Sequence, residues 1–256
     1  MNLILTFDYE LFGDGTGNVF THIIEPTNTM LGLCQKQSIK TTIFFEALEY
    51  LKLKEAWENG NAMGYTKNPV KAIEEQIQQA AIAGHDIQLH IHPQWHNAKY
   101  EKGKWHLNLN NWRLGDFKGD TNYSIKELIS DCKTALEALI QPVKPDYKCI
   151  GLRAGGYNII PSAEVYSAML ALGMKYDSSV YPGGYETGNL SKYDYRNVPM
   201  ELNHWWADAN DIRKISDKEK EILEIPIFFF FFSRWKRILT LSKIKSLLLR
   251  KRNAIS

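Results

Sequence analysis

Residues 84–95 have the sequence Gly-His-Asp-Ile-Gln-Leu-His-Ile-His-Pro-Gln-Trp, and this stretch decides the fold class. The segment Asp86–His90 predicts a β-strand, and it follows a segment from Pro69 to Ala83 in which apolar side chains recur at helical spacing. Gly84 is placed to end that helix, because glycine readily adopts the left-handed conformation found after a last helical turn. A helix leading into a strand in this way indicates an α/β fold.

The same alternation continues on both sides of this stretch. Further strands are expected over residues 2–7, 40–45, 147–152, 175–179 and part of 221–232, and further helices over 27–37, 124–140, 161–172 and 234–251. Ser124 and Glu127 form a capping box at the start of the helix expected over 124–140. Repeated β-α units predict a parallel sheet or barrel, in a single domain over residues 1–256.

The charge of the chain is unevenly distributed. Its 256 residues carry a net charge of +2, with 44% hydrophobic and 23% charged residues, which is typical of a globular protein. Residues 234–256 hold eight of the 31 Lys and Arg and no acid, so 23 bases face 29 acids in residues 1–233. This argues against a nucleic-acid partner. Segment 234–252 is expected to be a basic amphipathic helix, either the last helix of the domain or one making weak contact with a membrane surface.

The cellular location is predicted from the N-terminus and the cysteines. The chain begins without a basic region or a cleavage site of the kind found in signal peptides. Cys34, Cys132 and Cys149 are too few and too scattered for a disulfide framework. A cytoplasmic protein with reduced, buried thiols is therefore expected.

Three segments rich in chemically useful side chains follow predicted strands. They are Thr6–Glu10, His85–Trp95 and Gly151–Tyr157. Because the carboxyl ends of parallel strands meet at one edge of a sheet or one mouth of a barrel, we expect these segments to form a common site.

The spacing within two of these segments is typical of a metal site. Residues two apart on a strand point to the same face, so His90 and His92 can direct two imidazoles at one point, and Asp8 and Glu10 can do the same with two carboxylates. Imidazole and carboxylate together suit a divalent ion such as zinc. The alternative is a pair of core histidines. Arg153 is either a salt-bridge residue at the rim or the group that orients a catalytic carboxylate.

The three segments, in this order, resemble the polysaccharide deacetylases (the NodB-homology, carbohydrate-esterase-four superfamily). That family has a Thr-Phe-Asp-Asp signature, then a Gly-His-Glu-Ile-Gly-Asn-His stretch before a second histidine, then Arg-x-Pro-Tyr. The resemblance covers residues 3–179 and is best to a divergent branch found among surface-polysaccharide genes. It implies a distorted (β/α) barrel of about seven parallel strands, a TIM-barrel variant, and a carbohydrate substrate.

The resemblance also implies roles for individual residues. Catalytic roles fall to residues matching the family's base, its arginine, its oxyanion segment and its later aspartate, namely Asp8, Arg153, Tyr157 and Asp177. The metal, most simply zinc, would be held by Glu10, His90 and His92. Substrate contacts would come from the residues around these, namely Tyr9, Trp95, His96, Gly155 and Gly156.

The chain departs from the family in ways that leave alternatives open. The two acids are separated by Tyr9, so Asp8 and Glu10 can exchange the roles of base and ligand. No histidine follows the late strand, where the family has its general acid. Either His204 supplies this acid, or the chain lacks its C-terminal part, or the acid is absent.

These features together predict a metal-dependent hydrolase that removes an N-acyl group from an amino sugar or glycan. Two alternative functions remain. One is a catalytically impaired glycan-binding barrel. The other is a metal-dependent amidohydrolase acting on a C–N bond outside sugars, since a fold does not determine a substrate.

Overall fold

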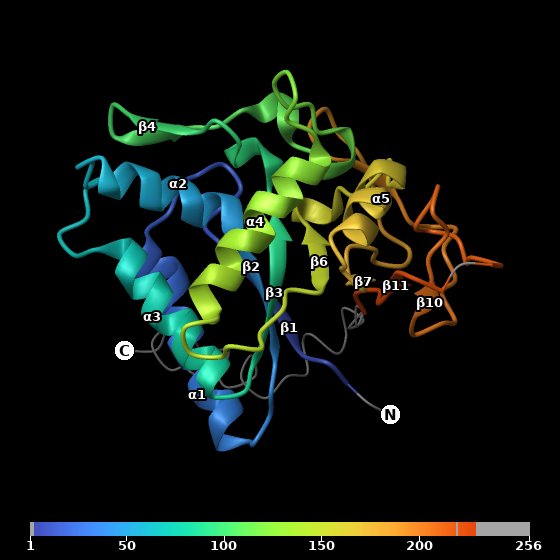
Figure 1. Cartoon of the computed structure of the whole chain (residues 1–256), viewed down its shortest axis with the longest axis horizontal. Coiled ribbons are helices and arrows are strands. Elements are labelled where there is room, and N and C mark those ends of the chain that lie inside the picture. Colours follow the sequence, from blue (N-terminus) through green and yellow to red (C-terminus); the bar gives the residue numbers. More distant parts are fainter. Residues whose placement is uncertain (1–2, 219, 229–256) are drawn as a thin grey trace, which may run out of the picture.

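The computed structural model describes residues 3–218 and 220–228. The basic helix expected over 234–252 lies outside these residues. The described part is a mixed α/β structure in which helices pack against a central sheet (Figure 1).

A largely parallel sheet of seven strands forms the centre of the fold. In spatial order its strands are β1 (Thr6–Tyr9), β2 (Thr42–Glu46), β3 (Asp86–Ile91), β6 (Gly151–Ala154), β7 (Tyr176–Asp177), β11 (Leu223–Glu224) and β10 (Trp205–Trp206). All neighbours in this order are parallel except β10, which runs antiparallel to β11. The expectation of parallel strands throughout is therefore wrong at this edge. No pairing among the described residues joins β1 to β10, so barrel closure stays a prediction.

Helices cover the sheet. They are η1 (a π-helix, Val19–Ile24), α1 (Glu25–Lys36), α2 (Ala47–Glu58), α3 (Pro69–Ile82), α4 (Ile125–Ile140) and α5 (Ala163–Ala171). Of these, α2, α3 and α4 contact β3, and α4 lies across β2 and β3 in Figure 1. None of the helices in the described ranges has the length and apolar character needed to cross a bilayer.

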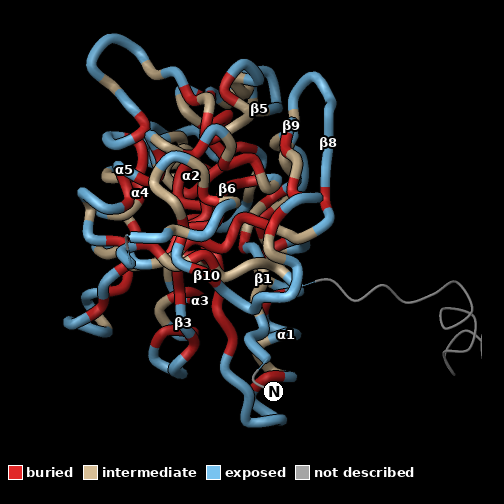
Figure 2. The backbone as a smooth tube through the Cα atoms, turned by 90° about the vertical axis from the view of Figure 1, so that its right-hand side faces the viewer, coloured by how far each residue is buried: buried red, intermediate tan, exposed pale blue. Residues whose placement is uncertain are grey.

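The ends of these helices follow from local sequence. Asn68 caps α3 by accepting the amide of Lys71, and Pro69 occupies the first turn, where its missing N–H has no partner to lose. The capping box predicted at Ser124 is present, with the Ser124 amide donating to Glu127 at 3.0 Å. The central strands β2, β3 and β6 are almost entirely buried. Figure 2 shows buried backbone at the centre of the molecule and exposed backbone around it.

Short elements occupy the long connections. Residues 91–123 contain the helical turns η2 (Pro93–Trp95), η3 (Leu109–Asn111) and η4 (Leu114–Asp116), and a hairpin of β4 (Lys99–Glu101) with β5 (Lys104–His106). A second hairpin joins β8 (Tyr185–Thr187) to β9 (Lys192–Asp194) and reaches into solvent (Figure 2). A further turn, η5, spans Gly155–Tyr157 directly after β6.

Two strands begin later than the sequence predicts. The strand expected over 147–152 is β6, which pairs with β3 only from Leu152 onward. The cause is Gln88, whose side-chain oxygen accepts the backbone amides of Ile150 and Gly151 at 2.9 and 2.7 Å. A side chain thus replaces the neighbouring strand as hydrogen-bond partner there. Similarly, β1 begins at Thr6 rather than residue 2, and Leu3 and Ile4 are exposed.

Candidate functional site

The carboxyl ends of the first four strands bring the site together. The parallel register aligns Glu46 with His90 and His90 with Arg153 across β2, β3 and β6. On the outer side of β2, Tyr9 aligns with Phe45, so Glu10 follows β1 at the level of Glu46. Side chains at one level of a parallel sheet point to one face, which explains why residues far apart in sequence meet here.

Four of these side chains form a compact group of possible ligands. One ligand atom each from Glu10, Glu46, His90 and His92 lies within 4.8 Å of the others. Nδ1 of His92 is 2.8 Å from a Glu10 oxygen and 3.0 Å from a Glu46 oxygen. Nε2 of His90 lies 3.6 Å from the same Glu10 oxygen. The residues predicted as ligands are thus adjacent, and Glu46 joins them.

A hydrogen bond to the main chain fixes the ring orientation of His90. Its Nδ1 lies 2.8 Å from the backbone oxygen of Arg153, and because that oxygen only accepts, Nδ1 carries the hydrogen. In the neutral ring, Nε2 therefore carries the free lone pair, and this nitrogen faces the carboxylates. This nitrogen is buried without a hydrogen-bond partner, an arrangement that suits a metal ligand.

Glu46 was not predicted from the sequence, although it ends a predicted strand in the same way as the other site segments. Its side chain is fully buried. One carboxylate oxygen accepts the amide of Leu48 at 3.1 Å and caps α2, and the other faces His92. The helix α2 was itself missed, and recognising Glu46 as its cap would have drawn attention to this residue.

Asp8 lies beside the group, paired with Arg153. Nη1 of Arg153 donates to an Asp8 oxygen at 2.7 Å, and the other Asp8 oxygen is 4.0 Å from Nε2 of His90. The guanidinium also donates to Thr6 and to the backbone and side chain of Ser178, and it stacks on Phe44 at 3.9 Å. Arg153 is therefore held on several sides while Asp8 keeps one oxygen toward the histidines.

Glu10 and His92 shift each other's pKa so that the carboxylate is negatively charged and the imidazole positively charged. Burial alone would raise the pKa of Glu10, but the charges of His92 and His90 outweigh it and lower that pKa well below its usual range. Burial alone would lower the pKa of His92, yet contacts with Glu10 and Glu46 raise it well above its usual value. In the absence of an ion, the histidine proton and the carboxylates thus stabilise one another.

The turn after β6 packs against the site. A Cβ atom on Gly155 would lie 2.2 Å from the His92 ring, so only glycine fits there. Gly156 has a φ of 55° and Tyr157 a φ of 66°, and the Tyr157 carbonyl accepts the hydroxyl of Tyr195 at 2.5 Å. Gly155 and Tyr157 thus adjoin the site, whereas the exposed Gly156 serves the turn.

Three residues predicted to contact substrate lie elsewhere. Tyr9 alternates with Asp8 and Glu10, so its side chain points to the other face and its hydroxyl donates to Gln76. Trp95 is buried and its ring packs against that of Trp105. His96 is stacked on Tyr123, with ring centroids 4.7 Å apart. The structure therefore does not bring these three side chains into the ligand group, and their contact with substrate stays a prediction.

The predicted acid machinery is not assembled either. Asp177 is buried beside Glu224 and accepts hydrogen bonds from the amide and hydroxyl of Ser179, so it orients no histidine. His204 is exposed, directly before β10, and among the described residues no hydrogen bond or ion pair joins it to the ligand group. The structure does not bring His204 to the site.

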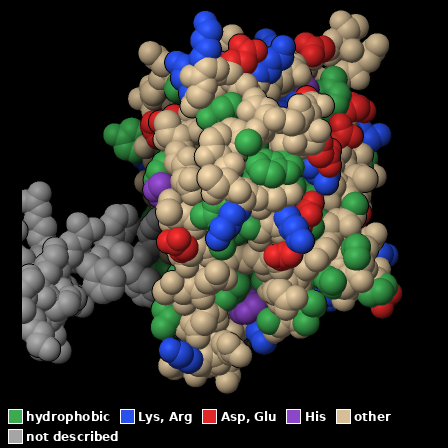
Figure 3. Space-filling model, turned by 90° about the vertical axis from the view of Figure 1, so that its left-hand side faces the viewer, with side chains coloured by type: hydrophobic (Ala, Val, Ile, Leu, Met, Phe, Trp, Pro, Cys, Tyr) green, Lys and Arg blue, Asp and Glu red, His purple; other side chains and the backbone are tan. Residues whose placement is uncertain are grey.

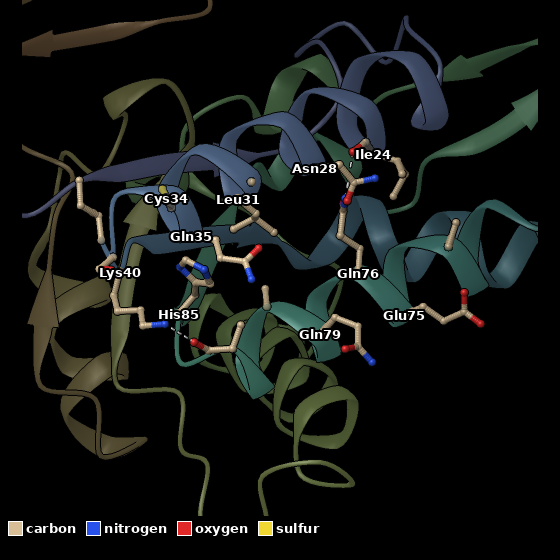
Figure 4. A pocket seen from close by; sticks show the side chains of 16 residues that line it. Ile24, Asn28, Leu31, Cys34, Gln35, Lys40, Glu75, Gln76, Gln79 and His85 are labelled. Atoms are coloured by element: carbon tan, nitrogen blue, oxygen red, sulfur yellow. Dashed lines mark hydrogen bonds between the residues drawn. The ribbon is translucent and has the colours of Figure 1, made fainter.

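A cavity of about 860 Å³ lies away from this group, between α1 and α3 (Figure 4). Lys40 and His85, which line it, precede β2 and β3 and so mark the amino ends of these strands, opposite the ligand group. The side of the molecule at the left of Figure 1 shows acidic, basic and hydrophobic side chains interspersed (Figure 3). Because the ligand group lies at the carboxyl ends of the strands and the cavity at their amino ends, we assign the candidate site to the carboxyl ends.

Comparisons with known proteins give one weak structural similarity. The chain matches no protein-family model and no curated protein. One similar solved structure is described as a "putative polysaccharide deacetylase from Mycobacterium smegmatis", at 13% identity and a TM-score of 0.44, over 98% of this chain and 71% of that one. Similarity at this level does not bear on the reaction, which has to be inferred from the site residues.

Proposed function

We propose that this protein is a metal-dependent hydrolase that removes an acetyl-type N-acyl group from an amino sugar or glycan, in surface-polysaccharide metabolism. One observation carries the proposal. Two histidines and two glutamates converge beside an aspartate held by arginine, at the carboxyl ends of adjacent parallel strands. Ligands, a base and its orienting group are the parts that metal-assisted hydrolysis requires.

The residues present fit a divalent ion. The buried Nε2 of His90 has no hydrogen-bond partner, and the donor set of nitrogen and oxygen suits zinc and related ions. Glu10, Glu46, His90 and His92 would hold the ion, which polarises an acyl carbonyl and acidifies water when bound.

Asp8 is suited to act as the base. Its pairing with Arg153 fixes one carboxylate oxygen and leaves the other directed at the ligand group. Asp8 accepts a proton from water as the water oxygen attacks the acyl carbon. The C–N bond then breaks and the leaving nitrogen takes up the proton that Asp8 accepted, which releases a carboxylic acid and the free amine.

Aromatic side chains beside the site support a carbohydrate substrate. The ring of Tyr157 lies 4.5 Å from that of Tyr181 and 5.8 Å from that of Tyr193. Burial first, and then the nearby charge of Asp8, raise the pKa of Tyr157. Such rings bind the apolar faces of sugars and offer a polar edge. The buried free cysteines support a cytoplasmic location.

Glycan binding without turnover is a second candidate. The observation that favours it is the position of His204, which is exposed and makes no contact with the ligand group among the described residues. A chain without a positioned acid can retain metal and ligand while turning over slowly or not at all.

The test combines metal analysis with a substrate panel of acetylated amino sugars, nucleotide sugars and simple amides. We expect one bound divalent ion and release of acetate from a sugar substrate. His92→Ala should abolish both, because it removes the nitrogen at the centre of the group. His106→Ala, on exposed β5, is the matched control and should change neither. Full activity in His92→Ala would contradict the proposal, and activity on amides alone would favour the amidohydrolase.

A further inference from the structure

The Glu46 side chain is held in a fixed position beside the ligand group. Its side chain is fully buried, and one oxygen is held by the amides of Leu48 and Glu49 at 3.1 and 3.4 Å. Rotation away from His92 would leave these first-turn amides of α2 without their cap. The second oxygen therefore stays directed at the ligand group, whether or not an ion is bound.

Charge balance requires this second carboxylate. Asp8 is neutralised by Arg153, so it does not compensate an ion in the group. A divalent cation with neutral histidines and Glu10 alone would leave one net positive charge among side chains that are mostly buried. With Glu46 included, the net charge is zero. Because an uncompensated buried charge is costly, Glu46 belongs to the charge-balanced set.

The number of donors then restricts the coordination. A catalytic zinc site commonly has three protein ligands and keeps its fourth tetrahedral position for water. Four protein donors would fill a tetrahedral ion completely. Hydrolysis at this site requires an ion that accepts at least five donors. Two imidazoles and two carboxylates, completed by water, suit Fe²⁺ and Mn²⁺.

We propose that Glu46 is a fourth protein donor and that the working ion is five- or six-coordinate, of the Mn²⁺ or Fe²⁺ class, rather than tetrahedral zinc. This inference rests on the proposed metal-dependent function and specifies its cofactor. It assigns Glu46 two tasks, because the residue both caps α2 and supplies the donor.

Cobalt substitution tests the coordination directly. Co²⁺ in a four-coordinate tetrahedral site absorbs visible light strongly, whereas five- and six-coordinate Co²⁺ absorbs weakly. The full chain is titrated with Co²⁺ and its visible spectrum recorded, together with the Co²⁺ affinity by calorimetry. For the wild type we expect weak bands and one bound ion, a readout that requires neither a variant nor enzymatic activity.

Two variants assign the donor. Glu46→Gln keeps the size of the side chain and an oxygen able to cap α2, but it removes the charge. It should weaken Co²⁺ binding at least about 10-fold and change the spectrum. Glu49→Gln is the matched control, because Glu49 is equally buried in the first turn of α2 and contacts the amide of Leu11 instead. This control should leave the affinity and the spectrum unchanged.

The outcomes separate the inference from the function on which it rests. Strong tetrahedral bands in the wild type, or a spectrum that Glu46→Gln leaves unaltered, would overturn the inference while leaving a metal-dependent hydrolase intact. A wild-type protein that binds no Co²⁺, Mn²⁺ or Zn²⁺ would overturn the proposed function as well.

Discussion

Arg153 contacts Asp8 through its guanidinium, with Nη1 2.7 Å from one carboxylate oxygen. The backbone oxygen of the same arginine accepts a hydrogen bond from His90 at 2.8 Å. One residue thus positions the proposed base through its side chain and a proposed ligand through its main chain.

Replacing Arg153 should therefore separate catalysis from ion binding. Lysine cannot reproduce the contacts of the guanidinium with Asp8, Thr6 and Ser178. We expect Arg153→Lys to lower kcat by about 10- to 100-fold, as for other groups that orient catalytic residues. Ion affinity should stay unchanged, because the main-chain bond to His90 remains. Steady-state kinetics and calorimetry measure the two effects.

The control for this change is Arg196→Lys, which alters an exposed arginine paired with Asp194. It should have wild-type kinetics. Loss of ion binding in Arg153→Lys would contradict the inference that the Arg153 side chain positions only Asp8 while its main chain positions His90.

Gly155→Ala should disrupt the ligand group. The added Cβ would overlap the His92 ring, so either the ring or the turn has to move. We expect about 1–3 kcal/mol lower unfolding free energy and a loss of ion affinity. Gly32→Ala provides the contrast, because a Cβ there meets nothing within 4 Å and the position lies inside α1. That variant should gain about 1 kcal/mol and bind the ion normally. Normal ion binding by both variants would show that His92 tolerates displacement.

The buried pair of Asp177 and Glu224 should make stability depend on pH. Burial first, and then the charge of Asp177, raise the pKa of Glu224 well above its ordinary value of 4.5. The folded state therefore holds a proton that the unfolded state releases above pH 4.5. Stability from this source is complete below that pH and declines as the pH rises toward the higher folded pKa, by about 1.4 kcal/mol per pH unit for one proton.

Glu224→Gln should flatten this decline, because the amide is neutral in both states. Urea unfolding at a series of pH values between 5 and 9 measures the slope. Glu164→Gln, at the exposed start of α5, should keep the wild-type slope. Glu49 is also buried with a raised pKa, so a residual slope is expected in Glu224→Gln. Identical slopes in wild type and Glu224→Gln would argue against a proton shared by this pair.

Ion binding should stabilise the fold. An ion that binds only the folded state adds about 2.7 kcal/mol at a free concentration of 100 times its Kd. We expect Mn²⁺ to raise the unfolding free energy of the wild type and a chelator to reverse the gain. Glu10→Gln should abolish the response, whereas Glu101→Gln, on the exposed strand β4, should keep it. Urea unfolding with and without ion measures the difference, and a full response in Glu10→Gln would exclude Glu10 as a ligand.

The sequence predicted the fold where periodicity and capping agree. The helix after Asn68 and the helix opened by Ser124 occur close to the predicted residues, because local signals determine their ends. The start of β6 could not be predicted in this way. It depends on Gln88, a residue about sixty positions earlier whose side chain takes the amides that a strand would have used.

The site was predictable in part for a similar reason. The spacing of His90 with His92 and of Asp8 with Glu10 shows which side chains share a face, and the structure brings all four close together. The same spacing excludes Tyr9, which had been included through resemblance alone. The burial of Trp95 depends on the β4–β5 hairpin that covers it, and nothing in its own neighbourhood indicates that packing.

The double attachment of Arg153 also offers a way to identify an unknown substrate. A protein altered only in the guanidinium should keep its ion and its binding surface while being slow to cleave. Such a protein retains what it captures, so incubation with a mixture of glycans followed by mass spectrometry of the bound fraction would reveal the preferred sugar without any prior guess at its structure.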